Sequence, residues 1–306
     1  MKSDTTEPKS LAQWNGQMQQ TTLRNSCQIN GIGLHTGTPA QMKLLPAAAD
    51  TGIVFRVGNT TIPAAAEYAV QTCMNTGLGR HGVTIGTVEH LLSALRGMEI
   101  DNVLIELSGE EVPAVDGSAE PFVQALLQAG RRTLPVPRRM IRLLDTVRVE
   151  EGDKFAEFGP SPVTSYNFHI AFNHQAVGQQ DHTVVLTPHT YQSEVAAART
   201  FGFESDLDAL RKSGLAQGAG LHNAVGLGAD GSVLNAEGLR FSDEFVRHKI
   251  LDAVGDLALF GAPILGAYTG HKAGHALNLK LTQALATNPQ SWEWVTGQEF
   301  QVVQAG

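Results

Sequence analysis

The stretch Phe245-Val-Arg-His-Lys-Ile-Leu-Asp-Ala-Val-Gly-Asp256 predicts one amphipathic helix with two distinct faces. At ~100° per residue, apolar side chains from Ile250 to Leu257 form one stripe, and polar side chains occupy a separate arc of ~80°. Three residues share that polar arc and point off the predicted core side: His248, Asp252 and Asp256. The helix therefore offers one imidazole and two carboxylates on one face.

The spacing of His248 and Asp252 favours metal binding without establishing it. Four residues apart, they put a nitrogen and an oxygen ligand one turn apart, as a helix does when it offers two ligands to a zinc-like ion. Such His/Asp pairs also occur by chance, either on the surface or in the core with their hydrogen bonds satisfied by other residues. A metal site would need a third ligand and catalytic groups from elsewhere in the chain.

Length and the order of the predicted strands and helices indicate a folded protein of two α+β domains of similar build. A chain of 306 residues exceeds the size at which one core usually keeps growing, so two domains are expected. Both halves show strands followed by helices, although no sequence repeat is legible. We place the boundary in the proline- and arginine-rich segment Gly130–Arg139. This gives a flexible tail at 1–19 and domains at 20–135 and 136–306, the second with an insert near 200–228.

Charge and cysteine content narrow the function classes. The net charge of −8, with no basic run, argues against a nucleic-acid surface. Cys27 and Cys73 are too few for a disulfide framework and form no Cys-x-x-Cys spacing. Neither an apolar signal segment nor a stretch of ~18 apolar residues is present. We expect a cytoplasmic protein without a transmembrane segment, a monomer that acts on a small molecule.

The segment Thr87-Val-Glu-His90 predicts the start of another helix, with Thr87 as its cap and apolar positions continuing to Leu95. Because neighbouring residues diverge by ~100° on a helix, Glu89 and His90 cannot both chelate one ion. His90 can bind a metal while Glu89 reaches the metal-bound water from the side. The alternative is a solvated Glu, favoured by the helix dipole, beside an ordinary His.

These residues together meet the needs of a zinc hydrolase. Zinc enzymes keep three protein ligands and leave the fourth position for water. Three residues meet that count: His90, His248 and Asp252. Glu89 is then the natural general base. His275, just before a predicted helix, can protonate a departing amine if Asp256 holds it protonated. Thr200, in an Arg-Thr-Phe-Gly turn, can donate to the oxyanion.

Two further features bear on the substrate. Lys249 and Lys272 would place two cations near one site and favour an anionic substrate, although lysines are usually solvated surface residues. The segment 200–228 contains Leu207, Leu210 and Leu215 and is apolar enough to line a groove. The alternative is that this segment only packs its apolar residues against the rest of the protein and binds no ligand.

Five motifs in order resemble those of the UDP-3-O-acyl-N-acetylglucosamine deacetylases, the zinc amidases of lipid A biosynthesis in Gram-negative bacteria. The resemblance runs from about Gln20 to Ala286. The motifs are Thr87-Val-Glu-His90, Asp116-Gly-Ser118, Arg199-Thr-Phe-Gly202, Phe245-Val-Arg-His-Lys-Ile-Leu-Asp252 and Lys272-Ala-Gly-His275.

The resemblance implies a fold and a set of roles. The fold would be two α+β domains of similar topology with the active site between them, and the insert would form an acyl-chain passage. Zn²⁺ would bind His90, His248 and Asp252. Glu89 would be the base, His275 the acid supported by Asp256, and Thr200 the oxyanion donor. Lys249 and Lys272 would face the nucleotide-sugar phosphates, and Phe172 would pack against the uracil. Candidates for the acyl passage and its surroundings are Phe201, Phe203, Leu207, Leu210, Leu215 and Leu221.

The implied reaction is hydrolysis of the N-acetyl amide of a UDP-linked acyl-glucosamine, with release of acetate. A zinc amidase acting on another N-acetylated sugar or lipid is an alternative. A non-catalytic protein that binds nucleotide sugars or acyl lipids is a second. The sequence does not specify the acyl-chain length, the oligomeric state, or whether iron replaces zinc.

Overall fold

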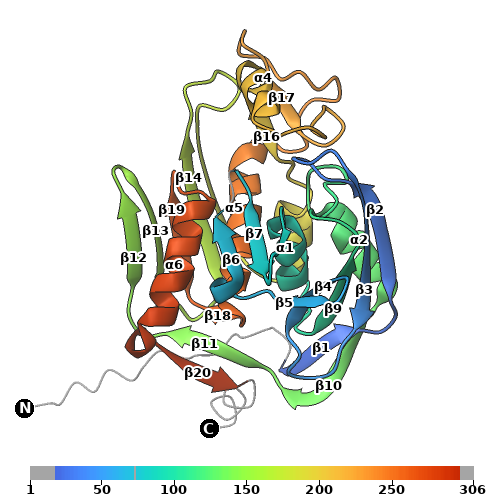
Figure 1. The fold of residues 1–306 in the computed structure, drawn as a ribbon. Coiled ribbons are helices and arrows are strands. Elements are labelled where there is room, and N and C mark those ends of the chain that lie inside the picture. Colours follow the sequence, from blue (N-terminus) through green and yellow to red (C-terminus); the bar gives the residue numbers. More distant parts are fainter. Residues whose placement is uncertain (1–17, 72–73, 297–306) are drawn as a thin grey trace, which may run out of the picture.

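The computed structural model describes residues 18–71 and 74–296. Most of the predicted tail at 1–19 lies outside the described residues, and so does the end of the predicted second domain beyond residue 296. Within the described part, strands and helices alternate around two large sheets (Figure 1). The predicted α+β fold class is confirmed.

The first half builds a five-stranded sheet from alternating apolar strands. Its strand order is β2-β3-β9-β4-β5, with β4 and β9 parallel and the other pairs antiparallel. Helix α1 (Glu89–Gly97) lies in sequence between β5 and β9, and α2 (Glu120–Ala129) follows β9. The strands are β2 (Cys27–Ile32), β3 (Pro39–Pro46), β4 (Ile53–Val57), β5 (Thr60–Pro63) and β9 (Val103–Leu107).

The second half repeats this topology. Its sheet has the order β12-β13-β19-β14-β15. The one parallel pair of this sheet, β14 with β19, is equivalent to β4 with β9 in the first half. Helix α5 (Glu244–Leu257) precedes β19 and α6 (His275–Thr287) follows it. The strands are β12 (Val147–Glu151), β13 (Lys154–Gly159), β14 (Ser165–Ala171), β15 (Gln179–Val185) and β19 (Ala267–His271). A strand requires only that alternate residues be apolar, so topology can repeat without a legible sequence repeat.

Smaller elements complete the molecule. Strands β1 and β10 pair, β11 pairs with β18 and β20, β6 to β8 form a meander, and β16 pairs with β17. Their bounds are β1 (Gln19–Leu23), β6 (Ala69–Gln71), β7 (Thr76–Arg80), β8 (Val83–Ile85), β10 (Arg131–Pro137), β11 (Arg139–Leu143), β16 (Phe201–Phe203), β17 (Val225–Leu227), β18 (Ile264–Leu265) and β20 (Trp292–Thr296). The remaining α-helices are α3 (Pro188–Thr190) and α4 (Glu204–Lys212). The boundary predicted near residue 135 falls within β10 and remains a prediction.

Four single-turn helices lie between these elements: Ala66–Tyr68, Tyr191–Val195, Ala258–Phe260 and Pro289–Ser291. Between β15 and β16 the described chain makes only the short helix α3 and the π-helical turn Tyr191–Val195, which ends at Val195. The Tyr191 ring packs against Gly97 of α1, and its hydroxyl donates to Ser93 Oγ at 2.8 Å. The buried Tyr191 side chain therefore anchors the start of the π-helical turn in the core.

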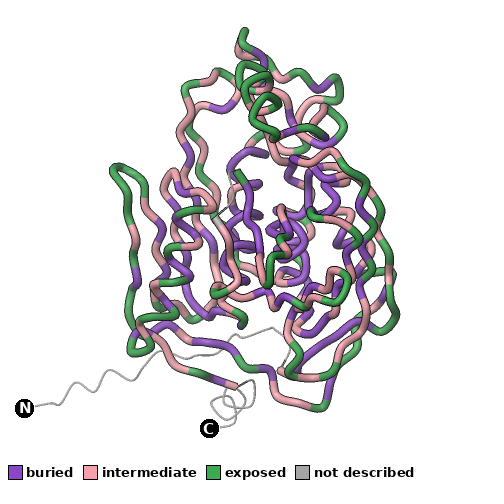
Figure 2. Tube along the Cα trace, viewed as in Figure 1, coloured by how far each residue is buried: buried purple, intermediate pink, exposed green. Residues whose placement is uncertain are grey.

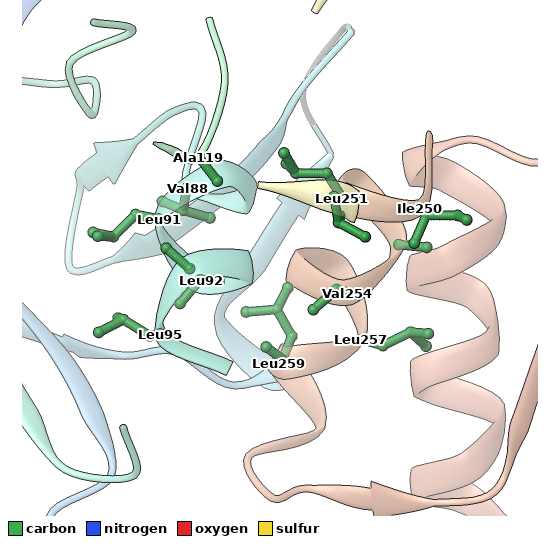
Figure 3. Close-up of a cluster of buried hydrophobic side chains, with 14 of the residues drawn as sticks. Val88, Leu91, Leu92, Leu95, Ala119, Ile250, Leu251, Val254, Leu257 and Leu259 are labelled. Carbon is green, nitrogen blue, oxygen red and sulfur yellow. The ribbon is translucent and has the colours of Figure 1, made fainter. Parts of the chain in front are cut away.

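The core of the molecule forms where α1 and α5 pack together between the two sheets. Figure 3 shows the α1 side chains Leu91, Leu92 and Leu95 in one cluster with Leu251 and Val254 of α5. Each fully buried leucine contributes about 1.5–3 kcal/mol to folding. The helices approach closely at Gly255, where an added Cβ would lie 2.0 Å from the Glu89 carbonyl oxygen.

Burial of α5 differs from the sequence expectation. We expected its polar arc to lie off the core side, yet His248, Asp252 and Asp256 are at most 2% exposed. Figure 2 shows that most of the chain at the centre of the molecule is buried. The reason is that α5 contacts α1, α6 and β14, so every residue from Ile250 to Leu257 is buried and only Arg247 and Lys249 of its middle part are partly exposed.

Thr87 does not cap α1, which corrects the expectation from its sequence position. Val88 is the N-cap residue, and no side chain caps the helix. Thr87 has φ 55° instead, and its hydroxyl donates to Glu111 Oε1 at 2.6 Å and accepts from Asn75 Nδ2 at 2.8 Å. A buried carboxylate is a strong hydrogen-bond acceptor, so it engages the hydroxyl that would otherwise serve the helix.

Candidate active site

Three predicted metal ligands from two helices meet in the core. His90 comes from the first turn of α1, and His248 and Asp252 come from successive turns of α5. Asp252 Oδ1 lies 3.6 Å from His90 Nε2 and 3.3 Å from His248 Nε2. The three ligand atoms lie within 4.8 Å of one another, and all three residues are buried. One atom from each residue thus faces a common point.

The hydrogen bonds around this cluster fit a bound cation. His248 Nδ1 lies 3.0 Å from the Ala198 carbonyl oxygen, which favours a proton on Nδ1 and a free lone pair on Nε2. Asp252 Oδ2 accepts from Lys249 Nζ at 2.8 Å. Asp252 Oδ1 is buried and has no hydrogen-bond partner within the part of the chain that the structure describes. Because a buried carboxylate oxygen is costly when unpartnered, this orphaned atom between two imidazoles fits a metal ligand.

The ionisation of these ligands also suits metal binding. Burial lowers the pKa of His248 to about 3, so its imidazole is neutral near pH 7. Burial by itself would raise the pKa of Asp252, but His248 and Lys249 bring it well below its usual value. Metals bind neutral imidazole and ionised carboxylate, which are the forms that this environment favours.

Glu89 lies beside the cluster without belonging to it. Its Oε2 accepts from the Thr76 N–H at 3.1 Å, and its Oε1 lies 4.0 Å from His275 Nε2. Burial raises the pKa of Glu89 to about 7, against smaller opposing effects of His275 and His90. A carboxyl group whose pKa lies near 7 can both accept and release a proton at neutral pH.

His275 and Asp256 form a second hydrogen-bonded pair. His275, the first residue of α6, has its Nδ1 3.0 Å from Asp256 Oδ2. Asp256 also accepts from Thr76 Oγ1 at 2.5 Å and from Asn278 Nδ2 at 2.8 Å. Burial lowers the pKa of His275, but the carboxylates of Asp256 and Asp252 outweigh it and raise this pKa to about 10. The imidazole is therefore protonated at neutral pH, as a general acid must be.

Thr200 follows the Ala198 carbonyl that orients His248. Its N–H donates to the Gly117 carbonyl oxygen at 2.8 Å, and its side chain lines an apolar cavity described below. The preceding Arg199 is buried and its Nε donates to Glu244 Oε1 at 2.8 Å, which fixes this turn on the start of α5. An oxyanion role for Thr200 stays a prediction.

The predicted phosphate lysines differ in their surroundings. Lys249 Nζ lies near Asp252 and 5.6 Å from the centre of the Phe201 ring. Lys272 lies in the turn between β19 and α6 with φ 49°, and its Nζ donates to Asp153 Oδ2 at 2.6 Å. Phe172 packs against Phe201, with ring centroids 5.7 Å apart. Their contacts with phosphate or uracil remain predictions.

An apolar cavity of about 280 Å³ lies in the segment predicted as an insert. Elements β16, α4 and β17 surround it, at the top of Figure 1. Among the predicted residues, those that line it are Phe201, Phe203, Leu207, Leu210 and Leu221. Leu215 is not among the lining residues. The ring centroids of Phe201 and His248 lie 6.4 Å apart, so the cavity begins beside the metal-ligand cluster.

Sequence reasoning missed Thr76 and Asn278. Thr76 connects the proposed base to the carboxylate that supports the proposed acid. Its N–H donates to Glu89 and its hydroxyl donates to Asp256. Asn278 holds Asp256 and is itself held by the Tyr268 hydroxyl, which donates to Asn278 Oδ1 at 2.7 Å. Asn278 lies three residues after His275 on one helix face, a spacing that the sequence does show. Thr76 lies in a short strand with no pattern that marks it.

Fold and site together define a class of protein: a two-part α+β enzyme with a buried His₂Asp cluster, an adjacent carboxylate and a carboxylate-supported histidine at the junction of its halves. Residues 20–287 match the UDP-3-O-acyl N-acetylglycosamine deacetylase family. The chain belongs to this family, which confirms the family resemblance and the prediction of a deacetylase.

Curated relatives carry the name UDP-3-O-acyl-N-acetylglucosamine deacetylase. The protein from Xanthomonas oryzae pv. oryzae (strain PXO99A) is 46% identical over 284 residues, which are 91% of this chain and 93% of the relative. The protein from Stenotrophomonas maltophilia (strain K279a) is 46% identical over 285 residues, covering 91% of this chain and 94% of the relative. Among the described residues, no helix combines the length and the apolar character needed to cross a membrane.

Proposed function

We propose that this chain binds Zn²⁺ through His90, His248 and Asp252 and hydrolyses the N-acetyl amide of UDP-3-O-acyl-N-acetylglucosamine, an early step of lipid A biosynthesis. The observation that carries the metal assignment is Asp252 Oδ1, buried and unpartnered between two imidazole Nε2 atoms. Two nitrogens and one oxygen are a donor set typical of catalytic zinc sites. A bound cation there would supply Lewis acidity toward the amide carbonyl and a lowered pKa for water.

The protein groups account for the proton transfers of amide hydrolysis. Glu89 accepts a proton from the water that attacks the acetyl carbonyl carbon. His275, protonated and held by Asp256, donates a proton to the sugar nitrogen as the C–N bond breaks. The products are the free amine and acetic acid, which releases a proton to solvent and leaves as acetate. Glu89 passes its proton back to His275, so one water is consumed and both groups return to their starting protonation states. Thr200 donates a hydrogen bond to the carbonyl oxygen while it carries negative charge.

The surrounding residues are consistent with a substrate that has anionic and apolar parts. Lys249 and Lys272 would attract the diphosphate, and Phe172 would contact the uracil. The cavity of about 280 Å³ would take the 3-O-acyl chain. With a net charge of −8 and no basic run, the chain is proposed to act on this small molecule in the cytoplasm, as a monomer that binds no nucleic acid.

The test is acetate release from UDP-3-O-acyl-N-acetylglucosamine by zinc-loaded protein. We expect one acetate per substrate, loss of turnover with a chelator and recovery on adding zinc. A UDP-free analogue of the same acylated sugar should react far more slowly. Equal rates on both substrates would favour a broader sugar or lipid amidase, and no acetate from either would contradict the proposal.

A further inference from the structure

A second cavity, of about 590 Å³, lies between the two halves of the molecule, away from the metal ligands. The loop before β4 and the last turn of α1 line it from the first half. Ala258 and residues 261–263, which follow α5, line it from the second half together with Trp294. Three arginines also line it: Arg96, Arg138 and Arg139. The proposed reaction uses none of them.

Arg96 is the unusual member of this group. Its Nε is buried without a hydrogen-bond partner, and no carboxylate among the described residues pairs with its guanidinium. Arg138, by contrast, pairs with Asp101 at 2.9 Å and Glu99 at 3.1 Å. Burial and the neighbouring Arg138 lower the pKa of Arg96 to about 10, so its side chain remains cationic at neutral pH. Asp101 and Glu99 oppose this pKa shift from nearby without pairing with the guanidinium, so a partly buried cation with a buried, unpartnered Nε would gain from an anion in direct contact.

Arg139 supplies a second available guanidinium. It lies 4.3 Å from the Trp294 ring centre and has no carboxylate partner within the described part of the chain. The two acids that line the cavity are already engaged, Asp101 by Arg138 and Asp50 by Gln20 Nε2 at 2.7 Å. The planar guanidinium fork suits phosphate oxygens well. We propose that this interdomain cavity binds a phosphate group, carried by a soluble phosphate compound or a lipid headgroup, between Arg96 and Arg139.

Thermal unfolding with inorganic phosphate tests this site. At ten times its Kd, phosphate should raise the Tm of the zinc-loaded wild type by about 2 °C. R96M and R139A should each lose most of that rise, whereas R132A, which changes an exposed arginine of β10, should keep it. K249A should also keep it, because Lys249 lies at the metal cluster. No rise in the wild type, or an equal rise in R96M and R139A, would overturn the proposal.

Vesicle sedimentation identifies the source of the phosphate. Binding to phosphatidylglycerol vesicles but not to phosphatidylcholine vesicles, with loss in R96M, would assign a lipid headgroup. A phosphate-dependent Tm rise without sedimentation would assign a soluble phosphate compound. R96M also tests the charge argument directly, because without phosphate it should melt no lower than the wild type. A clear drop in the Tm of R96M would show that Arg96 already has a stabilising role in the free protein and would count against the site.

A different observation concerns Glu111, a buried carboxylate outside the metal cluster. Its Oε2 accepts from the Thr36 N–H and from Thr36 Oγ1, each at 2.8 Å. Its Oε1 accepts from the His35 N–H at 3.0 Å and from Thr87 Oγ1 at 2.6 Å. Thr87, at φ 55°, is a β-branched residue in the left-handed region, a conformation that surrounding contacts must hold in place.

Glu111 therefore joins the apolar cavity to the turn that presents Glu89 and His90. Leu34 and His35 line that cavity, and both are tied to the insert: the Gln217 N–H donates to His35 O and the Gly218 N–H to Leu34 O, each at 3.0 Å. On the other side, Thr87 is two residues from Glu89. We infer, on the basis of the proposed function, that Glu111 is a positioning residue through which an acyl chain in the cavity orders the catalytic turn.

The test compares E111Q with the wild type on the acylated substrate and on an analogue without the 3-O-acyl chain. Wild-type kcat should be higher with the acyl chain. E111Q should lose about 10- to 100-fold in kcat on the acylated substrate and much less on the analogue, so that the acyl dependence disappears. T87S, which keeps the hydroxyl, should retain the acyl dependence.

Equal losses of kcat on both substrates, or a change in KM alone, would contradict the positioning role. Zinc content confirms that E111Q has kept its fold and its metal cluster. Failure of the proposed function itself is distinguishable, because the wild type would then release no acetate from either substrate.

Discussion

Helices α1 and α5 occupy equivalent places in the two repeated halves, yet they contribute to the site in different ways. Helix α5 presents His248 and Asp252 from its buried central turns, at a spacing that the helix itself fixes. Helix α1 presents Glu89 and His90 from its first turn, and their positions depend on the chain before the helix. A repeated scaffold can therefore position one group of site residues by helical geometry and another by a strained turn.

The largest expected effect comes from removing a histidine from either helix. H90A and H248A should each lose stoichiometric zinc after desalting, and turnover should fall at least about 1000-fold, because water loses its lowered pKa. Metal analysis and acetate release measure both effects. Zinc retained in only one of the two variants would show that the helices do not share a single ion.

The next effect separates Glu89 from its neighbour His90. E89A should keep its zinc and lose about 10²- to 10⁴-fold in kcat, because a general base acts on the reaction and not on the metal. A matched control is E120A, which removes a first-turn glutamate from α2. The control should keep nearly full activity, whereas loss of zinc from E89A would make Glu89 a ligand and contradict the assigned roles.

The pH dependence of turnover distinguishes the proposed base, Glu89, from the proposed acid, His275. Turnover should rise as Glu89 loses its proton near its pKa of about 7 and fall as His275 loses its proton near its pKa of about 10. A bound cation moves both limbs to lower pH. Because Asp256 raises the pKa of His275, D256N should move the alkaline limb down by about one unit or more. An unmoved alkaline limb in D256N would remove His275 from the role of acid.

The smallest expected effect concerns the contact between the helices. G255A adds a Cβ that would lie 2.0 Å from the Glu89 carbonyl oxygen, so α1 and α5 must separate. We expect a loss of about 1–3 kcal/mol in the free energy of unfolding and weaker zinc binding. Denaturant unfolding of the zinc-loaded protein measures the first. G109A is the control, because it adds the same methyl group at a position without a positive φ, where the nearest atom, Ala40 Cβ, would lie at an ordinary 3.5 Å.

Sequence patterns could predict the parts of the site that lie on regular elements. The helical period places His248, Asp252 and Asp256 on one face of α5, and the motifs indicated the partners of that face. The pattern could not show that this face is buried, because burial comes from the second sheet and from α6 packing around it. It also gave Thr87 a capping role, which a buried carboxylate 24 residues later overrides.

The remaining parts depend on contacts between distant segments. Thr76 reaches Asp256 across 180 residues of sequence, and no local pattern announces such a pair. Arg96 looks like an ordinary basic residue in the last turn of a helix until the cavity and its missing partner are seen together. The repeated topology was predicted in outline from the shared order of strands and helices, but the strand order and register that match between the two sheets come only from pairings between distant segments.

X-ray absorption of the zinc-loaded protein tests whether α1 and α5 hold one zinc ion between them. One zinc per chain should show two imidazole ligands and oxygen ligands at about 2.0–2.2 Å, with no sulfur scatterer. H90A and H248A, reloaded with excess zinc, should each lose one imidazole from the spectrum. A wild-type spectrum without two imidazoles, or one unchanged in both variants, would contradict a single ion held jointly by α1 and α5.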